Sequence, residues 1–322
     1  MNKKENFLRA VRRENPEWVP NNYEAAARIS CPVVERPTNA GRDDFGVLWN
    51  FSPEAEGGTY PSETELVVTD IEHWREQVIF PDLKKINWES VRDEVSKIDR
   101  EEFLVEGFCE MGLFERSYLL LGMEEALMAY YTHPEEMYAL CSAIADYKID
   151  LLRRYHAASG MDMIWYGDDW GTQQNLFVSP VIWRKIIKPN TKRIYDCLKE
   201  LGIIINQHSC GWIESILPDL CEMGTDIWNP CQPCNNLAEM KKRYGGEISF
   251  WGGVDSQFIL DNPAATPEDV RIEVRKRIDK MALPAGGYIL GPSHSVPYEP
   301  AKLHAMKTEA SEYGCAVYQK NK

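Results

Sequence analysis

Positive charge is scarce in this chain. Its 322 residues include 36 Lys and Arg against 50 Asp and Glu, which gives a formal net charge of −14. A nucleic-acid-binding surface needs clustered Lys and Arg, and anionic membranes attract basic segments, so neither partner is expected. No apolar run approaches the length of a membrane-spanning helix, and residues 1–13 are too charged for a signal peptide. We therefore expect a cytoplasmic protein.

Signals for disulfides, phosphate loops and domain linkers are also missing. Nine cysteines, an odd number at scattered positions, fit free thiols better than a disulfide framework. Cys231 and Cys234 form a C-x-x-C without a second such pair, so two loop thiols are favoured over a zinc knuckle. No Gly-rich turn follows the first predicted strand, which argues against an open dinucleotide-binding sheet. No Pro/Gly/Ser linker divides the chain, so we expect a single domain over residues 1–322.

From residue 102 onward, strand and helix patterns alternate regularly. The predicted strands are residues 103–107, 161–166, 202–206, 225–228, 248–251 and 287–290. The predicted helices are residues 123–131, 134–159, 180–201, 213–222, 237–244 and 267–281. Repeated strand–helix units imply parallel strands, and enough of them close a barrel. We therefore predict an α/β protein, a (β/α)8 TIM barrel with an N-terminal extension and an irregular insertion at residues 43–60.

The sharpest chemical pair follows the third predicted strand. In such barrels the reactive groups lie at the C-terminal ends of the strands. His208 and Cys210 are two residues apart in extended chain, so both side chains can point to the same side. Imidazole and thiolate together suit Zn²⁺. The alternative is a hydrogen-bonded rim histidine beside an inert buried cysteine.

Other predicted strand ends supply further candidates. His294 follows the last strand, and a closed barrel brings it round towards the first pair as a possible third metal ligand. Asp168 and Asp169 are candidate catalytic acids or bases, although such a pair can equally cap the following turn. Gln232 and Asp255 are candidates for substrate binding.

Two tryptophans, Trp170 and Trp212, lie just past predicted strand ends. Placed there, they could stack on a flat ligand. An aromatic ring and a tetrapyrrole face would both suit them, and the residue types do not distinguish the two. We assign both tryptophans to substrate binding.

Several motifs together resemble the uroporphyrinogen decarboxylase-like superfamily. They are residues 164–173 (IWYGDDWGTQ), 207–211 (QHSCG), 228–233 (WNPCQP), 250–255 (FWGGVD) and 286–294 (GGYILGPSH). The segment from residue 5 to residue 20 fits as well, so the resemblance extends over nearly the whole chain. It implies a (β/α)8 barrel with a pocket at its C-terminal face.

The branches of this superfamily differ in chemistry. Haem-pathway members decarboxylate uroporphyrinogen without a metal and carry an Arg-rich N-terminal segment, whereas residues 21–25 here (NNYEA) are neutral to acidic. Such a pocket would leave the carboxylates of uroporphyrinogen uncompensated. The chain more closely resembles the corrinoid-dependent methyltransferases, in which a His-x-Cys at the position of His208 and Cys210 binds zinc. Thiol-methylating members have a cysteine ligand where this chain has Ser293, beside His294.

The resemblance therefore implies a zinc-dependent methyltransferase. It would move a methyl group from a methylated donor, expected to be a methoxylated aromatic, to the Co(I) corrinoid of a separate corrinoid-binding protein, as in O-demethylation. Its cofactors would be Zn²⁺ and the partner-borne cobalamin. The alternatives are a uroporphyrinogen decarboxylase and a non-catalytic protein that binds a tetrapyrrole or a small aromatic.

Overall fold

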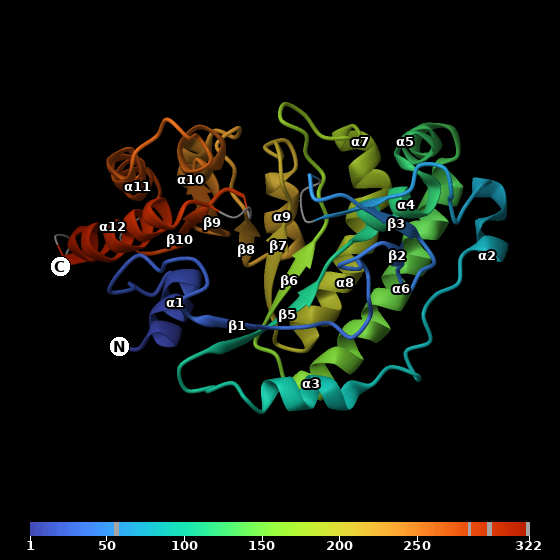
Figure 1. Ribbon diagram of the computed structural model, residues 1–322, viewed down its shortest axis with the longest axis horizontal. Helices are drawn as coiled ribbons and strands as arrows, with labels where there is room; N and C mark the ends of the chain where they lie inside the picture. The colour runs from blue at the N-terminus through green and yellow to red at the C-terminus, as the bar shows by residue number, and fades with distance from the viewer. Residues whose placement is uncertain (55–57, 283–284, 295–297, 320–322) are drawn as a thin grey trace.

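The architecture is an α/β fold built on a curled parallel sheet (Figure 1). The structure, a computed structural model, describes residues 1–54, 58–282, 285–294 and 298–319. Seven parallel strands pair in the order β1-β5-β6-β7-β8-β9-β10. They are β1 (Ala26–Ile29), β5 (Leu104–Cys109), β6 (Met163–Gly167), β7 (Ile204–His208), β8 (Ile227–Asn229), β9 (Ser249–Val254) and β10 (Tyr288–Pro292).

The two edges of the curled sheet approach one another through the segment that precedes β1. Asn21 forms an isolated parallel bridge with Leu290 of β10, and the Leu290 N–H donates to the Pro20 carbonyl at 2.9 Å. The predicted barrel-type α/β fold is thereby confirmed. Among the described residues its main sheet has seven strands rather than eight.

Helices pack around the outside of the sheet. They are α1 (Lys3–Arg12), α2 (Trp74–Gln77), α3 (Trp88–Val95), α4 (Leu113–Leu121), α5 (Met123–Thr132), α6 (Pro134–Ser159), α7 (Pro180–Ile182), α8 (Lys188–Glu200), α9 (Leu217–Met223), α10 (Leu237–Tyr244), α11 (Pro267–Met281) and α12 (Pro300–Gln319). Short π-helical turns cover Trp183–Ile187 and Ser256–Leu260, and a 3₁₀ turn covers Ile71–His73. The side chains of Ser179 and Thr266 cap α7 and α11, each followed by a proline at the first helical position. None of the described helices is both long and apolar enough to span a membrane.

The predicted insertion forms a small antiparallel sheet of β2 (Gly41–Arg42), β3 (Leu48–Phe51) and β4 (Thr59–Pro61). Buried charges fix the segment that contains it to the helices. Arg116 of α4 donates to Asp43 at 2.7 Å, and Lys148 of α6 is paired with Glu35. Arg116 and Lys148 are fully buried. Moving the segment away would leave Arg116 and Lys148 as buried, uncompensated charges, which is costly. These contacts therefore hold the small sheet in one place.

The N-terminal end of the curled sheet is filled by apolar side chains. Phe7 and Val11 of α1 pack with residues from the starts of several strands, among them Leu104, Met163 and Ile227. Figure 1 shows α1 beside β10 and α12, close to both ends of the chain. Because one end of the sheet is closed in this way, a cavity can form at the C-terminal ends of the strands.

Candidate metal centre

The pairing of β6 with β7 brings three ligand-type side chains together. Gly167, the last residue of β6, lies opposite His208, the last residue of β7. The chain then continues into Asp169 on one strand and Cys210 on the other. One ligand atom from each of Asp169, His208 and Cys210 lies within 4.8 Å of the other two. We call these three residues the metal cluster.

Distances within the metal cluster are short. The Cys210 Sγ lies 3.4 Å from the His208 Nε2, and this Nε2 lies 3.6 Å from the Asp169 Oδ1. The same carboxylate oxygen accepts a hydrogen bond from the Cys210 backbone N–H at 2.7 Å, which ties the two loops together. The geometry is set by hydrogen bonds within the protein.

The imidazole of His208 is oriented by its second nitrogen. Its Nδ1 lies 2.9 Å from the side-chain oxygen of Asn229, at the end of β8. An amide oxygen can only accept, so the proton belongs on Nδ1 and the lone pair of Nε2 faces the metal cluster. Burial lowers the pKa of His208 although the Asp169 carboxylate opposes this shift. The ring is therefore neutral near pH 7, as metal ligation requires.

The donor set fits zinc. Zinc bonds of about 2.0–2.3 Å at tetrahedral angles place neighbouring ligand atoms about 3.4–3.6 Å apart. The observed separations of 3.4 and 3.6 Å match this requirement. Sulfur, imidazole nitrogen and carboxylate oxygen are the ligand types that zinc uses, and three protein ligands with a fourth position left open are typical of catalytic zinc sites.

The metal cluster lies in the wall of a cavity of about 490 Å³. This volume is in the range of small-molecule pockets. Much of the remaining wall is aromatic and comes from the small sheet, β5, α4 and β6: Trp49, Tyr60, Phe108, Tyr118 and Trp165. The sequence interpretation missed these residues, because aromatics inside strands usually belong to the core. The signal was the position of Phe108 and Trp165 near the C-terminal ends of their strands.

Charged residues complete this cavity. Arg28 lies over the rings of Phe108 and Trp165, at 4.8 and 5.2 Å from their centroids, and is paired with buried Glu106 at 2.8 Å. Glu115 also lines the cavity. Burial raises the pKa of Glu115 well above its ordinary value, and the nearby carboxylates raise it further. The cavity thus contains aromatic side chains, two arginines and a carboxyl group whose pKa is raised.

Asp168 lies outside this cavity and is fully buried. Its carboxylate accepts from the first backbone N–H groups of α4, those of Leu113, Phe114 and Glu115, at 2.9–3.1 Å. It also accepts from the indole N–H of Trp170 at 2.8 Å. Burial raises the pKa of Asp168 to about 6, although these donors favour the charged form. Asp168 therefore caps α4, an earlier helix, and not the turn that follows it in the sequence; a catalytic role for Asp168 stays a prediction.

The backbone around this cap is tightly packed. Gly112 is the residue directly before α4. A Cβ atom at this position would lie 2.4 Å from the Cβ of Asp168. Only glycine therefore allows the helix to begin this close to the carboxylate. This contact explains how a residue 55 positions further along the chain from Leu113 can cap α4.

The two predicted stacking tryptophans are placed away from the cavity. Trp170 is 1% exposed, and its ring packs edge-to-face on Trp183 with centroids 5.1 Å apart. Trp212 is half-buried, and its backbone N–H donates to the Thr172 carbonyl. Neither lines the cavity of the metal cluster, whose aromatic wall comes from other residues, Trp165 and Phe108 among them. A role in substrate binding stays a prediction for both.

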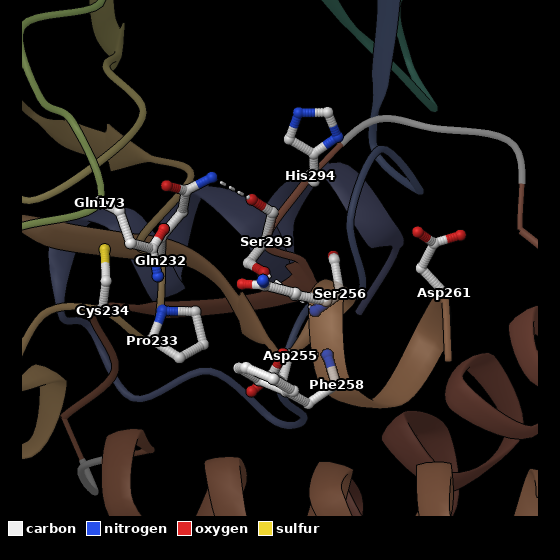
Figure 2. A pocket seen from close by; sticks show the side chains of 11 residues that line it. Gln173, Gln232, Pro233, Cys234, Asp255, Ser256, Phe258, Asp261, Ser293 and His294 are labelled. Atoms are coloured by element: carbon white, nitrogen blue, oxygen red, sulfur yellow. Dashed lines mark hydrogen bonds between the residues drawn. The ribbon is translucent and has the colours of Figure 1, made fainter. Parts of the chain in front are cut away.

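A second cavity of about 400 Å³ opens at the ends of β8, β9 and β10 (Figure 2). Gln232 accepts from the Gly211 N–H at 2.6 Å and donates to the Ser293 carbonyl at 2.9 Å. Asp255 accepts from the Phe258 N–H at 2.9 Å and caps the turn that follows β9. Both predicted substrate-binding residues line this cavity, and both also hold loops together. Their binding roles stay predictions.

His294 connects the two cavities, since its side chain lines both. In Figure 2 its imidazole stands above Ser293, which occupies the position predicted for a third ligand in related proteins. The Ser293 hydroxyl accepts from the Ser256 N–H at 3.1 Å. His294 does not belong to the metal cluster as defined by ligand-atom distance, and its role as a ligand stays a prediction.

Comparisons with known proteins agree with this architecture. A family model described as "Uroporphyrinogen decarboxylase (URO-D)" matches residues 52–313. The solved structure of a methyltransferase from Methanosarcina mazei aligns with a TM-score of 0.74 at 14% identity, over 97% of this chain and 99% of the other. A 3-keto-D-glucoside 4-epimerase from E. coli aligns with a TM-score of only 0.36 at 11% identity, over 69% of this chain and 95% of the other. No curated protein sequence matches.

Proposed function

The chain belongs to the uroporphyrinogen decarboxylase family, and from this premise we propose that it is a zinc-dependent methyltransferase of that family. It takes a methyl group from a methylated donor, a methoxylated aromatic, and gives it to the Co(I) corrinoid of a partner protein. The methyl–oxygen bond breaks with its electrons left on oxygen, which takes up a proton from solvent, and a cobalt–carbon bond forms.

The metal cluster is the observation that carries this proposal. The decarboxylating members of this family act without a metal, so a set of ligand atoms such as that of Asp169, His208 and Cys210 is not expected of them. The solved structure that aligns over 97% of the chain is described as a methyltransferase, which supports the same branch. We assign Asp169 as the third ligand. The acid or base roles predicted for Asp168 and Asp169 stay predictions.

The walls of the cavity suit a flat, partly apolar donor. Phe108 and Trp165 stack on one another with centroids 4.6 Å apart, and Trp165 lies 4.3 Å from the His208 ring. Both faces of Trp165 are thus covered, and a substrate ring would lie against the other aromatic walls, with its ether oxygen directed at the metal cluster in the same cavity. Zinc bound there would supply a Lewis acid that withdraws charge from the departing oxygen. The protein's share is to orient the ring and exclude water.

Two arginines in the cavity, Arg28 and Arg36, give some support to the decarboxylase alternative. Both come from the N-terminal region and could bind carboxylates of a substrate. Arg28 is already paired with Glu106, and Arg36 donates to Thr59 and lies 4.0 Å from Glu110. Two arginines with these partners do not match the many carboxylates of uroporphyrinogen, since carboxylate recognition relies on Arg forks. We therefore favour the methyltransferase.

Single-turnover methyl transfer tests the proposal. Zinc-loaded protein is mixed with cob(I)alamin, as a stand-in for the corrinoid of the partner, and with a panel of methoxylated aromatics. Formation of methylcobalamin is followed by absorbance. We expect transfer from at least one donor, slower by more than about 100-fold in metal-free protein and in Cys210→Ser, because stabilisation of the leaving oxygen is lost.

Two outcomes would contradict the proposal. The first is methyl transfer at equal rates with and without zinc. The second is conversion of uroporphyrinogen to coproporphyrinogen at ordinary enzyme concentrations. A protein that binds the aromatic donors but transfers no methyl group would instead be the non-catalytic binding protein of the third alternative.

A further inference from the structure

We propose that Asn229 is a positioning residue that fixes the imidazole of His208 in the tautomer and orientation that a metal ion requires. The inference rests on the proposed metal site. It assigns to a strand-end amide a function that its residue type alone does not suggest, because Asn at the end of a strand is most often a turn residue.

The sheet register brings the two side chains together. His208 and Asn229 are directly opposite one another in the pairing of β7 with β8. Their backbones are also tied, since the Ser209 N–H donates to the Asn229 carbonyl at 2.7 Å. Asn229 is only 6% exposed. Its amide therefore has little freedom to turn away from the histidine.

The hydrogen bond decides which nitrogen faces the metal cluster. The His208 Nδ1 donates to the Asn229 Oδ1 at 2.9 Å. The opposite nitrogen, Nε2, then presents its lone pair to the space 3.4 Å from the Cys210 Sγ and 3.6 Å from the Asp169 Oδ1. If the proton moved to Nε2, this ligand position would be blocked.

A second contact restrains the face of the same ring. Trp165 of β6 lies against His208 with centroids 4.3 Å apart and an interplanar angle of 34°. Trp165 is itself held on its other side by Phe108, at 4.6 Å and 26°. The imidazole is thus fixed at its edge by Asn229 and over its face by Trp165. Two restraints in different directions leave the ring one orientation.

A partner of this kind has a measurable effect on metal binding. Groups that hydrogen-bond the far nitrogen of a ligating histidine set its tautomer, and their loss typically weakens metal affinity by about 10–100-fold. Asn229→Leu keeps the size of the side chain and removes the acceptor. Asn229→Asp keeps the size and provides a stronger acceptor.

The experiment has two readouts. The first is the tautomer of His208 in metal-free protein, from ¹⁵N–¹H correlation spectra of the imidazole, assigned with His208→Gln. We expect the proton on Nδ1 in wild type and in Asn229→Asp, and loss of this preference in Asn229→Leu. The second readout is zinc affinity by competition with a chromophoric chelator. We expect zinc binding about 10–100-fold weaker in Asn229→Leu and at least as tight as wild type in Asn229→Asp.

Asn236→Asp is the matched control. Asn236 caps α10 through its side-chain oxygen and is exposed, so this variant adds the same charge outside the metal cluster and keeps a good cap. We expect zinc affinity unchanged in it.

The two hypotheses fail differently. A proton on Nε2 in folded wild type, or zinc affinity in Asn229→Leu within twofold of wild type, would overturn the role of Asn229. A wild-type protein with the proton on Nδ1 but without zinc affinity would overturn the proposed function and leave the orienting hydrogen bond in place.

Discussion

Two groups of loops at the same end of the sheet carry similar residues and use them differently. After β6 and β7, Asp169, His208 and Cys210 turn their ligand atoms towards one point. In the loops after β8, β9 and β10, the side chains of Gln232 and Asp255 form hydrogen bonds with neighbouring backbone groups. Polar side chains at strand ends become a candidate site only where the loops leave their atoms directed at a common space.

The largest expected effect is loss of zinc from variants in the loops after β6 and β7, and not from variants in the loops after β8, β9 and β10. His208→Ala and Cys210→Ser should weaken zinc binding by more than about 100-fold, because even outer partners of a ligand are worth about 10–100-fold. Asp255→Asn, on the other loops, should bind zinc like wild type. Elemental analysis and chelator competition measure both. Equal zinc in all variants would erase the contrast between the two groups of loops.

The neighbouring aspartates sharpen the contrast within a single turn. Asp168→Asn should lower the free energy of unfolding by about 1–3 kcal/mol, because a buried acceptor of several N–H groups is replaced in part by a donor. Asp169→Asn should change stability little and weaken zinc binding. Thermal or denaturant unfolding beside zinc titration separates the two. A stable Asp168→Asn that has lost zinc would reverse these assignments.

The pH dependence of zinc binding is the next effect in size. Burial holds the pKa of His208 below its ordinary value of 6.5, so the ring is already neutral at pH 7. Between pH 7 and 8 zinc therefore displaces no proton from His208, and this residue adds nothing to the pH dependence of zinc affinity. Below the lowered pKa of His208 the ring takes up a proton, and zinc affinity should then fall more steeply as the pH decreases. Protons on both ring nitrogens of His208 at pH 7, seen in the imidazole NMR spectra of metal-free protein, would contradict a lowered His208 pKa.

The smallest effect concerns the loop after β9. Asp255→Ala removes the side chain that accepts from the Phe258 N–H and should cost about 1 kcal/mol of stability, as for other caps. Zinc affinity should stay unchanged, since Asp255 is not part of the metal cluster. Urea unfolding and chelator competition on the same sample give both numbers. A change in zinc affinity larger than threefold would show that the two groups of loops form one site.

Much of the fold could be predicted from hydrophobic patterns. All six strands predicted after residue 102 are present, and the helices Pro134–Ser159, Leu237–Tyr244 and Pro267–Met281 match the prediction residue for residue. The strands end one to three residues later than predicted. Several of them end in polar or small residues, as at His208 and Asn229, and main-chain pairing continues past the apolar run that the pattern detects.

Other elements gave too little local signal. β1 (Ala26–Ile29) has small and charged residues, and it pairs with β5, which lies far along the chain. α4 (Leu113–Leu121) follows Gly112 and takes its cap from Asp168. Neither partner is visible in a local stretch of sequence, because a contact between distant segments decides the structure.

The candidate site divides in the same way. His208 and Cys210 could be predicted because residue type and strand-end position agree. The sequence could not predict which of Asp168 and Asp169 is the metal ligand. Only the path of α4 shows that the Asp168 carboxylate caps this helix. Trp165 lies inside a strand, where a tryptophan usually belongs to the core, and its contact with His208 depends on the curl of the sheet.

Zinc K-edge absorption spectroscopy on protein loaded with one zinc per chain tests the central claim most directly. The account predicts one sulfur at about 2.3 Å and nitrogen or oxygen neighbours at about 2.0–2.2 Å, with the sulfur signal lost in Cys210→Ser. A zinc ion surrounded by oxygen and nitrogen alone in the wild-type protein, with the same spectrum in the variant, would contradict the assignment of Asp169, His208 and Cys210 as the metal centre.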